Sequence, residues 1–153
     1  MPQLNDIHSQ LNPTQAARVL APQSLADVQA ALAQARDRGL CVVISGGRHA
    51  MGGQQFAQGG LQLDMRAMQQ VLHADGERGL LRMQAGAMWP DVIAAARAMP
   101  HAPGSAPWAI RQKQTGVDLV SLGGSISANA HGRGLGLQPL GGDIEDLQLL
   151  LPN

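Results

Sequence analysis

The stretch Cys41-Val-Val-Ile-Ser-Gly-Gly-Arg-His-Ala-Met-Gly-Gly-Gln54 decides how we interpret the rest of the chain. Four β-favouring residues, Cys41 to Ile44, lead straight into Ser45 and a pair of glycines. This pattern predicts a short buried strand that ends in a tight turn, because glycine permits positive φ. Consecutive N–H groups in such a turn form a concavity that suits a phosphate. The alternative is a structural corner that merely needs glycine, since Gly-Gly turns are common.

The composition is that of a folded domain with many tight turns. The chain has 153 residues, of which 44% are hydrophobic and 14% charged, and it contains 19 glycines. A chain this hydrophobic can form a core, and so many glycines suit a close approach of the backbone to a large ligand. The 11 Lys and Arg residues balance the 11 Asp and Glu residues, which argues against nucleic acid or an anionic membrane as a partner.

The sequence predicts a cytoplasmic protein without a metal site. No apolar run approaches the roughly 18 residues of a membrane span, and the first ten residues lack the apolar core of a signal peptide. The lone Cys41 can form no internal disulfide, which permits a reducing compartment. His8, His73 and His101 lack the spacing of a zinc site and are expected to be surface residues.

Hydrophobic periodicity predicts an alternation of helices and short strands. Ser24 and Asp27 have the spacing of a capping box, which begins a helix that Gly39 ends. The buried face of this helix is expected to carry Leu25, Val28, Leu32 and Ala35. Further helical segments are expected over 14–20, 65–70 and 125–130 and from Trp89 to Pro100. Strands are expected at 41–45, 61–64, 71–74, 80–85, 118–122 and 146–151, with an Asp-Gly turn joining the third and fourth as a hairpin.

The end of the chain predicts a continuation. The expected strand at 146–151 runs into Pro152-Asn153, the first half of a turn, with nothing to return it. A single strand cut at its turn leaves an edge with unpaired backbone groups. We therefore expect the chain to be the N-terminal part of a longer protein, the alternative being a terminus on an edge strand.

Two glycine-rich loops, at 45–54 and 121–136, each follow an expected strand. Neither fits the G-x-G-x-x-G pattern of dinucleotide-binding folds, and the chain has no Walker P-loop. The two loops share small residues, backbone N–H groups and an Arg-His or His-x-Arg pair. These features suit a long phosphate-bearing ligand held from two sides.

The order of five motifs resembles the vanillyl-alcohol oxidase superfamily. These motifs are Pro22-Gln23-Ser24 before a helix, Ser45-Gly46-Gly47-Arg48-His49, Leu122-Gly123-Gly124-Ser125, Ala130-His131-Gly132, and Gly142-Asp143 before a final strand. More narrowly, the chain resembles the FAD-binding domain named after p-cresol methylhydroxylase (PCMH-type). The resemblance implies an α+β fold of two α/β subdomains, one with a small mostly parallel sheet and one with a larger mixed or antiparallel sheet and flanking helices. It also implies a lead-in segment over 1–21, a truncated FAD-binding domain over 22–153, and an absent substrate domain.

The resemblance also implies which residues contact the cofactor FAD. Backbone amides of the first loop would wrap the pyrophosphate, and the second loop would contact the flavin and its ribityl chain. The stretch from His49 to Gln54 resembles the His-Ser-x-x-Gly-Gln motif of cytokinin-dehydrogenase-like members, with Ala50 in place of their serine. The expected contacts are Ser45, Gly46, Gly47, Arg48, His49, Ala50, Met51 and Gln54 in the first loop, and Gly123, Gly124, Ser127, Asn129, His131, Gly132 and Ile144 in the second region.

The function implied by the resemblance is that of the FAD-binding part of a flavin-dependent oxidoreductase. Such enzymes oxidise a small organic substrate, such as an alcohol, an amine or a sugar, by hydride transfer to FAD. Several members bond the flavin 8α-methyl to a histidine at the position of His49, while others hold FAD without a covalent link, and both readings stay open. His131 is expected to pack or hydrogen-bond beside the flavin, and no catalytic base is assigned. The alternatives are a non-catalytic FAD or nucleotide-binding module and an inactive gene fragment without its substrate domain.

Overall fold

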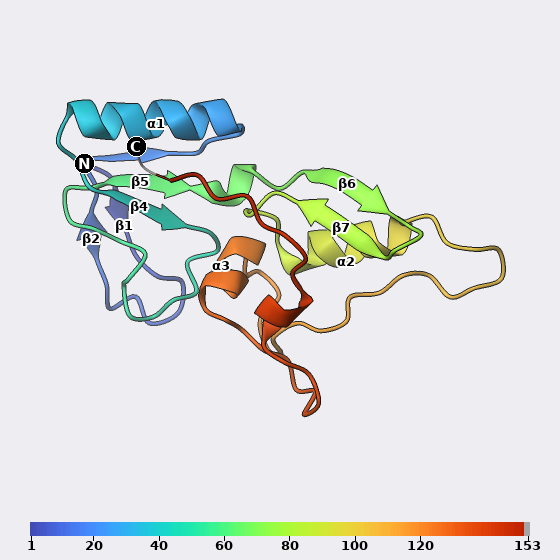
Figure 1. The fold of residues 1–153 in the computed structure, drawn as a ribbon. Coiled ribbons are helices and arrows are strands. Elements are labelled where there is room, and N and C mark those ends of the chain that lie inside the picture. The colour runs from blue at the N-terminus through green and yellow to red at the C-terminus, as the bar shows by residue number, and fades with distance from the viewer. Residues whose placement is uncertain (152–153) are drawn as a thin grey trace. The chain divides into compact units, whose positions relative to one another are not determined.

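The computed structural model describes residues 1–151, which form two compact units. Unit 1 spans Met1–Met68 and unit 2 spans Gln69–Leu151. Each unit has its own hydrophobic core and its own small sheets, drawn in Figure 1. The mixed α/β class expected from the sequence is therefore confirmed, whereas the larger second sheet and the incomplete C-terminus stay predictions.

Unit 1 is built on a three-stranded parallel sheet in the order β3-β5-β4. The central strand β5 (Leu61–Asp64) lies between β3 (Arg18–Leu20) and β4 (Val42–Ser45). In this register Ile44 pairs with Leu63 and Ser45 with Asp64, so the first glycine-rich loop leaves the sheet beside the end of β5. Two further strands, β1 (Gln3–Leu4) and β2 (Thr14–Gln15), form a separate antiparallel pair.

Helix α1 (Leu25–Asp37) packs on this parallel sheet (Figure 1). As the sequence predicts, Ser24 and Asp27 form a reciprocal capping box, and Gly39 takes a φ of +61° just after the helix. The core joins two alanines of the helix to two leucines of the central strand, namely Ala31, Ala35, Leu61 and Leu63. Small side chains on the helix let its backbone approach the sheet closely.

Three expectations for unit 1 are wrong. The segment 14–20 forms strands instead of a helix, because β3 gains a full parallel register with β5 that a helix of seven residues between two prolines cannot match. The strand at 42–45 is an edge strand, and its Ile44 is 61% exposed, so it is not buried. Leu25 is exposed as well, because the buried face of α1 is centred on its alanines.

Unit 2 combines a hairpin with two helices. Strands β6 (Val71–Asp75) and β7 (Leu80–Met83) pair antiparallel, which confirms the expected hairpin. Helix α2 (Trp89–Ala98) has Pro90 in its first turn, where the missing N–H costs nothing. Trp89, Val92 and Leu140 form the core of the unit. The remaining elements are α3 (Leu122–Ser127) and two 3₁₀ turns, η1 (Met65–Ala67) at the end of unit 1 and η2 (Leu140–Asp143) in unit 2.

Two expectations for unit 2 are also wrong. Residues 146–151 form no strand, because no neighbouring segment pairs with them, and Leu147, Leu149 and Leu151 are exposed. The turn expected at Pro152-Asn153 lies outside the described residues. The extended segment at 118–122 is limited to one bridge between Ser121 and Met88, and Gly123 and Gly124 lie inside α3 instead of before it. Across residues 1–151, none of the helices has the length and apolar character that crossing a membrane requires.

Candidate functional site

The first glycine-rich loop begins at the carboxyl end of β4. Ser45, which closes the strand, is only 4% exposed, and Gly46 to Ala50 are partly buried. Met51 and Gln54 are exposed. The structure therefore keeps the predicted residues of this loop together on one irregular segment.

Three groups outside residues 45–54 donate hydrogen bonds to carbonyl oxygens of the loop. The Arg48 carbonyl accepts a hydrogen bond from the Ile7 N–H at 3.2 Å. The Ala50 carbonyl accepts from the side chain of Gln55 at 2.8 Å, and the Met51 carbonyl from that of Asn12 at 2.8 Å. In a trans peptide the N–H points opposite to the C=O, and the chain has no cis peptide among its described residues. The peptide N–H groups that follow Ala50 and Met51 are therefore turned away from the groups that hold the loop.

Arg48 brings a positive charge to the loop and has a left-handed backbone conformation. Its φ of +58° lies in the left-handed region that non-glycine residues seldom adopt. Its charge also reaches Asp64 at the end of β5. Burial acts to raise the pKa of Asp64, but the hydrogen bonds from Arg66 and the charges of Arg66 and Arg48 outweigh burial and lower that pKa.

His49 contacts a residue that sequence reasoning set aside. The Nδ1 atom of His49 lies 2.8 Å from Nε2 of His8, and the two ring centroids are 4.9 Å apart. His8 is an exposed residue, as the sequence predicts, yet it is hydrogen-bonded to a candidate site residue. No spacing rule could have found this pair, because the two residues are 41 positions apart.

Asp6 organises the segment that carries His8. Its carboxylate is almost fully buried and accepts hydrogen bonds from the backbone N–H groups of His8, Ser9 and Gln10 at 2.9, 2.6 and 3.2 Å. The side chains of Ser9 and Asn12 donate to it at 2.8 and 2.9 Å. Burial acts to raise the pKa of Asp6, but these hydrogen bonds outweigh it and hold the pKa well below its ordinary value.

This lowered pKa predicts how the stability of the protein depends on pH. A carboxylate with a lowered folded-state pKa stabilises the fold above its unfolded pKa of about 3.9 and loses that contribution as pH falls further. The pKa values of Asp27 and Asp75 are also lowered, chiefly by the backbone N–H groups of Gln23 and Arg78. We expect the free energy of unfolding to decline below pH ~4. The difference in free energy of unfolding between wild type and Asp6→Asn should narrow there, because protonated Asp6 loses its charge. Urea titrations at several pH values would measure this difference, and a difference independent of pH would contradict the assignment.

The second glycine-rich region starts at the short helix α3 in unit 2. Ser121 caps it and accepts a hydrogen bond from the Gly124 N–H at 3.2 Å. The Gly123 N–H donates to the Ala85 carbonyl at 2.8 Å, and a Cβ at Gly123 would lie 3.1 Å from the Ala85 Cβ. Ser127 donates its hydroxyl to the Gly123 carbonyl at 2.7 Å. The glycines of this motif thus let α3 approach the end of the hairpin closely.

The residues after α3 form an exposed loop braced by a neighbouring segment. The Gly132 N–H donates to the Gln112 side chain at 3.3 Å, and a Cβ at Gly132 would lie 2.9 Å from the Lys113 carbonyl. His131 is exposed, with Nδ1 2.9 Å from the Gly132 carbonyl. Asn129 is exposed with a φ of +46°, and Ile144 is half-buried just after η2.

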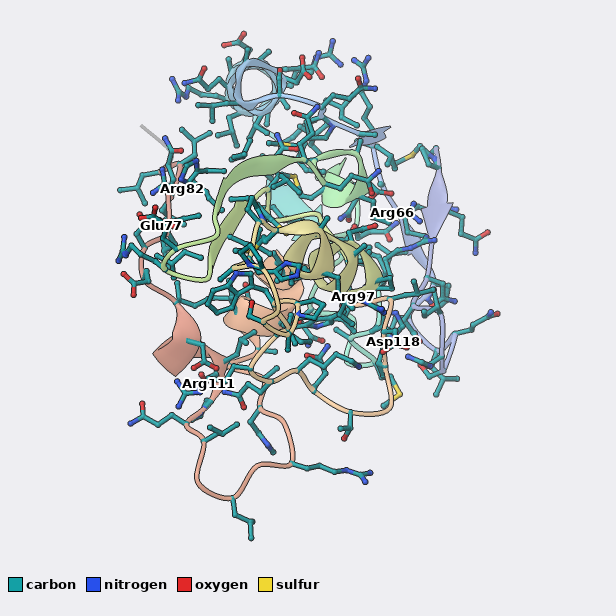
Figure 2. The ribbon with its side chains drawn as sticks, turned by 90° about the vertical axis from the view of Figure 1, so that its right-hand side faces the viewer. Arg66, Glu77, Arg82, Arg97, Arg111 and Asp118 are labelled. Carbon is teal, nitrogen blue, oxygen red and sulfur yellow. The ribbon has the colours of Figure 1, made fainter. Side chains whose placement is uncertain are left out.

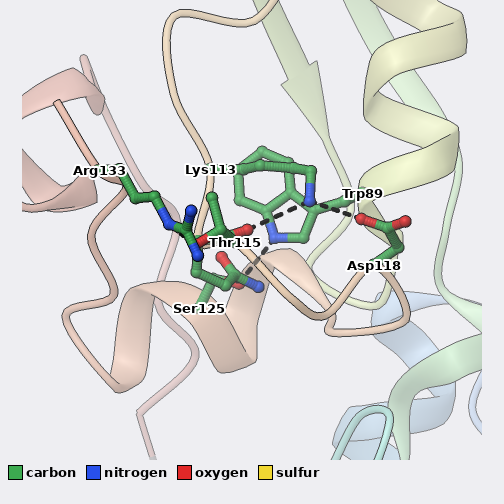
Figure 3. Close-up of polar contacts among 7 residues, drawn as sticks. Trp89, Lys113, Thr115, Asp118, Ser125 and Arg133 are labelled. Carbon is green, nitrogen blue, oxygen red and sulfur yellow. Dashed lines mark hydrogen bonds and ion pairs between the residues drawn. The ribbon is translucent and has the colours of Figure 1, made fainter.

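The bracing segment, residues 111–115, has no regular secondary structure. Figure 3 shows how it meets α2 and α3: Trp89 donates its indole N–H to the Ser125 hydroxyl at 3.1 Å, and that hydroxyl lies 3.4 Å from the Gln114 side chain. Two ion pairs support the segment. Lys113 pairs with Asp118 at 2.5 Å (Figure 3), and Arg111, labelled in Figure 2, pairs with Asp143 at 3.1 Å. Arg133 donates to Thr115 at 3.0 Å. No pattern of glycines or charges in the sequence marks this support.

The predicted site residues thus fall into one group in each unit. Those of the first loop, from Ser45 to Gln54, belong to unit 1, and those from Gly123 to Ile144 belong to unit 2. Within unit 1 the supporting contacts reach the loop between Arg48 and Met51. Within unit 2 the residues of α3 and the following loop share the braces at 112–115, while Ile144 lies after η2.

Comparisons with known proteins point to one family. The family described as FAD binding domain matches residues 16–153. An uncharacterized oxidoreductase from the fasciation locus of Rhodococcoides fascians is 33% identical over 117 residues, which cover 76% of this chain and 26% of that protein. The chain therefore spans about a quarter of the length of this curated relative.

Solved structures show a similar fold. An alkyldihydroxyacetonephosphate synthase superposes with a TM-score of 0.61 at 20% identity, covering 74% of this chain and 22% of that one. Cholesterol oxidase from B. sterolicum superposes with a TM-score of 0.60 at 16% identity, covering 85% of this chain and 24% of that one. At these identities the likeness concerns the fold alone.

Proposed function

Because the chain belongs to the family of FAD binding domains, we propose that it forms the FAD-binding part of a flavin-dependent oxidoreductase. Family membership confirms the resemblance to the vanillyl-alcohol oxidase superfamily that the motif order indicated. The relative in R. fascians carries the name of an oxidoreductase, which supports the activity. We propose the FAD-binding domain to span residues 22–153, with residues 1–21 as a lead-in and the substrate domain elsewhere in the protein.

One observation carries the proposed role of the first loop. The carbonyl oxygens of Arg48, Ala50 and Met51 are all held by groups outside residues 45–54, and the N–H of each of these peptides is turned away from the group that holds its carbonyl. A diphosphate needs N–H donors on one side and no competing carbonyl oxygens there. Arg48 supplies a cation on the same segment, which favours an anion. Ser45, Gly46, Gly47, Arg48 and Ala50 are accordingly proposed to hold the FAD pyrophosphate, and His49, Met51 and Gln54 are proposed as further FAD contacts.

The residues of unit 2 are proposed to hold the flavin end of FAD. Gly124 provides exposed backbone, while Gly123 and Gly132 let α3 and the following loop pack closely on Ala85 and Lys113. Both are proposed to contact FAD through their backbone, and Ser127, Asn129 and His131 provide exposed polar groups. Ile144 provides an apolar contact. The braces at 112–115 are proposed to keep this surface rigid, since ligand sites work best on locked supports.

The proposed reaction is the oxidation of a small organic substrate such as an alcohol, an amine or a sugar. When bound, FAD supplies the chemistry by accepting a hydride from the substrate. The residues of this chain would bind and orient the cofactor, while the substrate pocket and any base are proposed to come from the rest of the protein.

The pyrophosphate assignment predicts a preference for FAD over riboflavin. The His49→Ala variant of the full-length protein cannot retain flavin through this histidine, so its affinities are measurable by titration. We expect FAD to bind at least about 10-fold more tightly than riboflavin, because a few charge-assisted hydrogen bonds to phosphate exceed the 1.4 kcal/mol that a factor of ten requires. Isothermal titration calorimetry with both ligands measures the ratio. Equal affinities would contradict the proposed role of the first loop.

A covalent bond between a ring nitrogen of His49 and the 8α-carbon of the flavin is proposed as well. It would replace one C–H bond of the 8α-methyl group and the ring N–H bond, releasing two protons to solvent and two electrons that would pass through the flavin to an acceptor such as oxygen. Because Nδ1 of His49 is hydrogen-bonded to His8, a bond to flavin through that atom would require the His8 contact to break. We expect acid-precipitated wild-type protein to keep flavin fluorescence on the polypeptide, and His49→Ala to release it. The matched control is His73→Ala, an exposed histidine on β6 outside the proposed FAD contacts, which should keep the fluorescence on the polypeptide. A non-fluorescent wild-type pellet would show that FAD is held without a bond.

A further inference from the structure

We propose that residues 5–12, called here the N-terminal clamp, hold the backbone of residues 48–51 and the ring of His49 in one conformation before any ligand binds. In this proposal His8 is a positioning residue for His49. The consequence for cofactor binding rests on the proposed function above, whereas the clamping itself does not. Both segments belong to unit 1 and lie side by side in Figure 1.

The clamp is a closed polar turn built around a buried carboxylate. Asp6, 2% exposed, draws the N–H groups of the next residues around itself. Asn5 closes the turn, since its side-chain oxygen accepts from the N–H of Asn12 at 3.0 Å and its amide donates to the Gln10 carbonyl at 2.8 Å. A turn with so many internal hydrogen bonds has little freedom left and can support a neighbouring loop.

The clamp meets the glycine-rich loop at three places along four consecutive residues. Ile7 donates to the Arg48 carbonyl, His8 pairs with His49, and Asn12 donates to the Met51 carbonyl. Asn12 also donates to Asp6 from the same amide nitrogen, so the contact with the loop is tied directly to the centre of the clamp. A single contact could be incidental, but three contacts within residues 48–51 fix both the position of the loop and the direction of its peptide groups.

Two backbone features of the loop fit this role. Arg48 keeps a left-handed φ of +58°, which a bulky side chain disfavours and which the Ile7 contact at its carbonyl helps to hold. Gly53 has a φ of +72°, and a Cβ there would lie 2.7 Å from the side-chain oxygen of Asn12. A side chain at Gly53 would therefore crowd the Asn12 side chain and displace it from the loop.

The contact between His8 and His49 constrains the protons of both rings. A hydrogen bond between two ring nitrogens needs one N–H donor and one bare acceptor nitrogen. Protonation of both rings would place two donors against each other and break the contact. In the folded protein the Nδ1 atom of His49 is thus either the acceptor or the donor of one shared proton, and its ring plane is set by His8.

The direct test needs no cofactor. In the flavin-free full-length protein labelled with ¹⁵N-histidine, we expect a scalar coupling across the hydrogen bond between Nε2 of His8 and Nδ1 of His49. His8→Phe should abolish this coupling and raise the amide hydrogen exchange of residues 48–53 by about 10-fold, with the fold intact because His8 is exposed. Absence of the coupling in wild type, or unchanged exchange in His8→Phe, would overturn the proposal.

A pair of glycine variants tests the backbone contact independently. Gly53→Ala and Gly59→Ala face the same unfavourable φ, +72° and +69°, but a Cβ at Gly59 has nothing within 4 Å. We expect Gly53→Ala to accelerate exchange across residues 48–53 and Gly59→Ala to leave it unchanged. Equal exchange in the two variants would show that the Asn12 contact does not hold the loop.

The effect on cofactor binding separates the clamp from the proposed function. At equal, subsaturating FAD, His8→Phe should load flavin about 10-fold more slowly than wild type, and His8→Gln should restore part of the rate because its amide can still hydrogen-bond to His49. The loading rate is defined whether or not His49 bonds to the flavin. If coupling and exchange behave as expected but wild type binds no FAD, the clamp is supported and the proposed function fails. If wild type and His8→Phe load FAD at equal rates, the positioning role of His8 fails while the proposed function stands.

Discussion

Trp89→Ala is expected to lower the free energy of unfolding of unit 2 by about 3–5 kcal/mol, the usual loss for truncating a buried tryptophan. Trp89 is 2% exposed and lies at the centre of the unit 2 core with Val92 and Leu140. Its loss would leave a cavity and remove the indole N–H that donates a hydrogen bond to the Ser125 hydroxyl. Trp108, also in unit 2, remains as the fluorescent reporter for urea unfolding. A loss below about 1 kcal/mol would contradict this account of the core.

A second variant isolates the polar part of this contact. Ser125→Ala keeps the tryptophan but leaves its indole N–H without the hydroxyl, and we expect a loss of about 1–3 kcal/mol. The matched control is Ser127→Ala on the same helix, where the serine is exposed and bonds only to the helix backbone. That control should change the free energy of unfolding by less than about 0.5 kcal/mol.

Leu63→Ala is expected to destabilise unit 1 by about 2–5 kcal/mol. Leu63 is fully buried on the central strand β5, where it packs against the alanines of α1. Because unit 1 contains no tryptophan, circular dichroism or hydrogen exchange of β5 would follow this transition. The loss should also loosen Ser45, since Ser45 and Asp64 are register partners one position beyond Leu63.

The neighbouring strand supplies the control for this prediction. Ile44 pairs directly with Leu63 in the parallel register but is 61% exposed. We expect Ile44→Ala to cost less than about 1 kcal/mol, mainly through lost β-propensity. If both substitutions destabilised the protein equally, burial would not be what distinguishes the two strands.

The sequence predicts elements whose local chemistry agrees with their environment. The capping box at Ser24 and the Asp-Gly turn of the hairpin are complete in themselves, and both are present in the structure. The sequence wrongly predicts a helix over 14–20, because the two strands there exist only through pairing with other segments. β2 pairs with β1, and β3 pairs with β5, which lies 40 or more residues away. The leucines at 147–151 were misread as a strand because apolar alternation alone provides no partner strand.

The same limit applies to the candidate site. The two glycine-rich loops are visible in the sequence because glycine pairs and neighbouring Arg and His residues are local features. Their supports are not visible, because Asn12, His8 and Gln112 are ordinary polar residues until the fold brings them to the loops. Tertiary contacts of this kind leave no period and no motif.

The absorbance spectrum of the purified full-length protein, recorded after incubation with FAD and removal of unbound cofactor, tests the central claim most directly. If the chain is the FAD-binding part of a flavoprotein, the sample should be yellow and contain one flavin per polypeptide. Its flavin content should fall when the first loop is disturbed by Gly53→Ala but not by Gly59→Ala. A colourless, flavin-free protein after reconstitution would contradict the account.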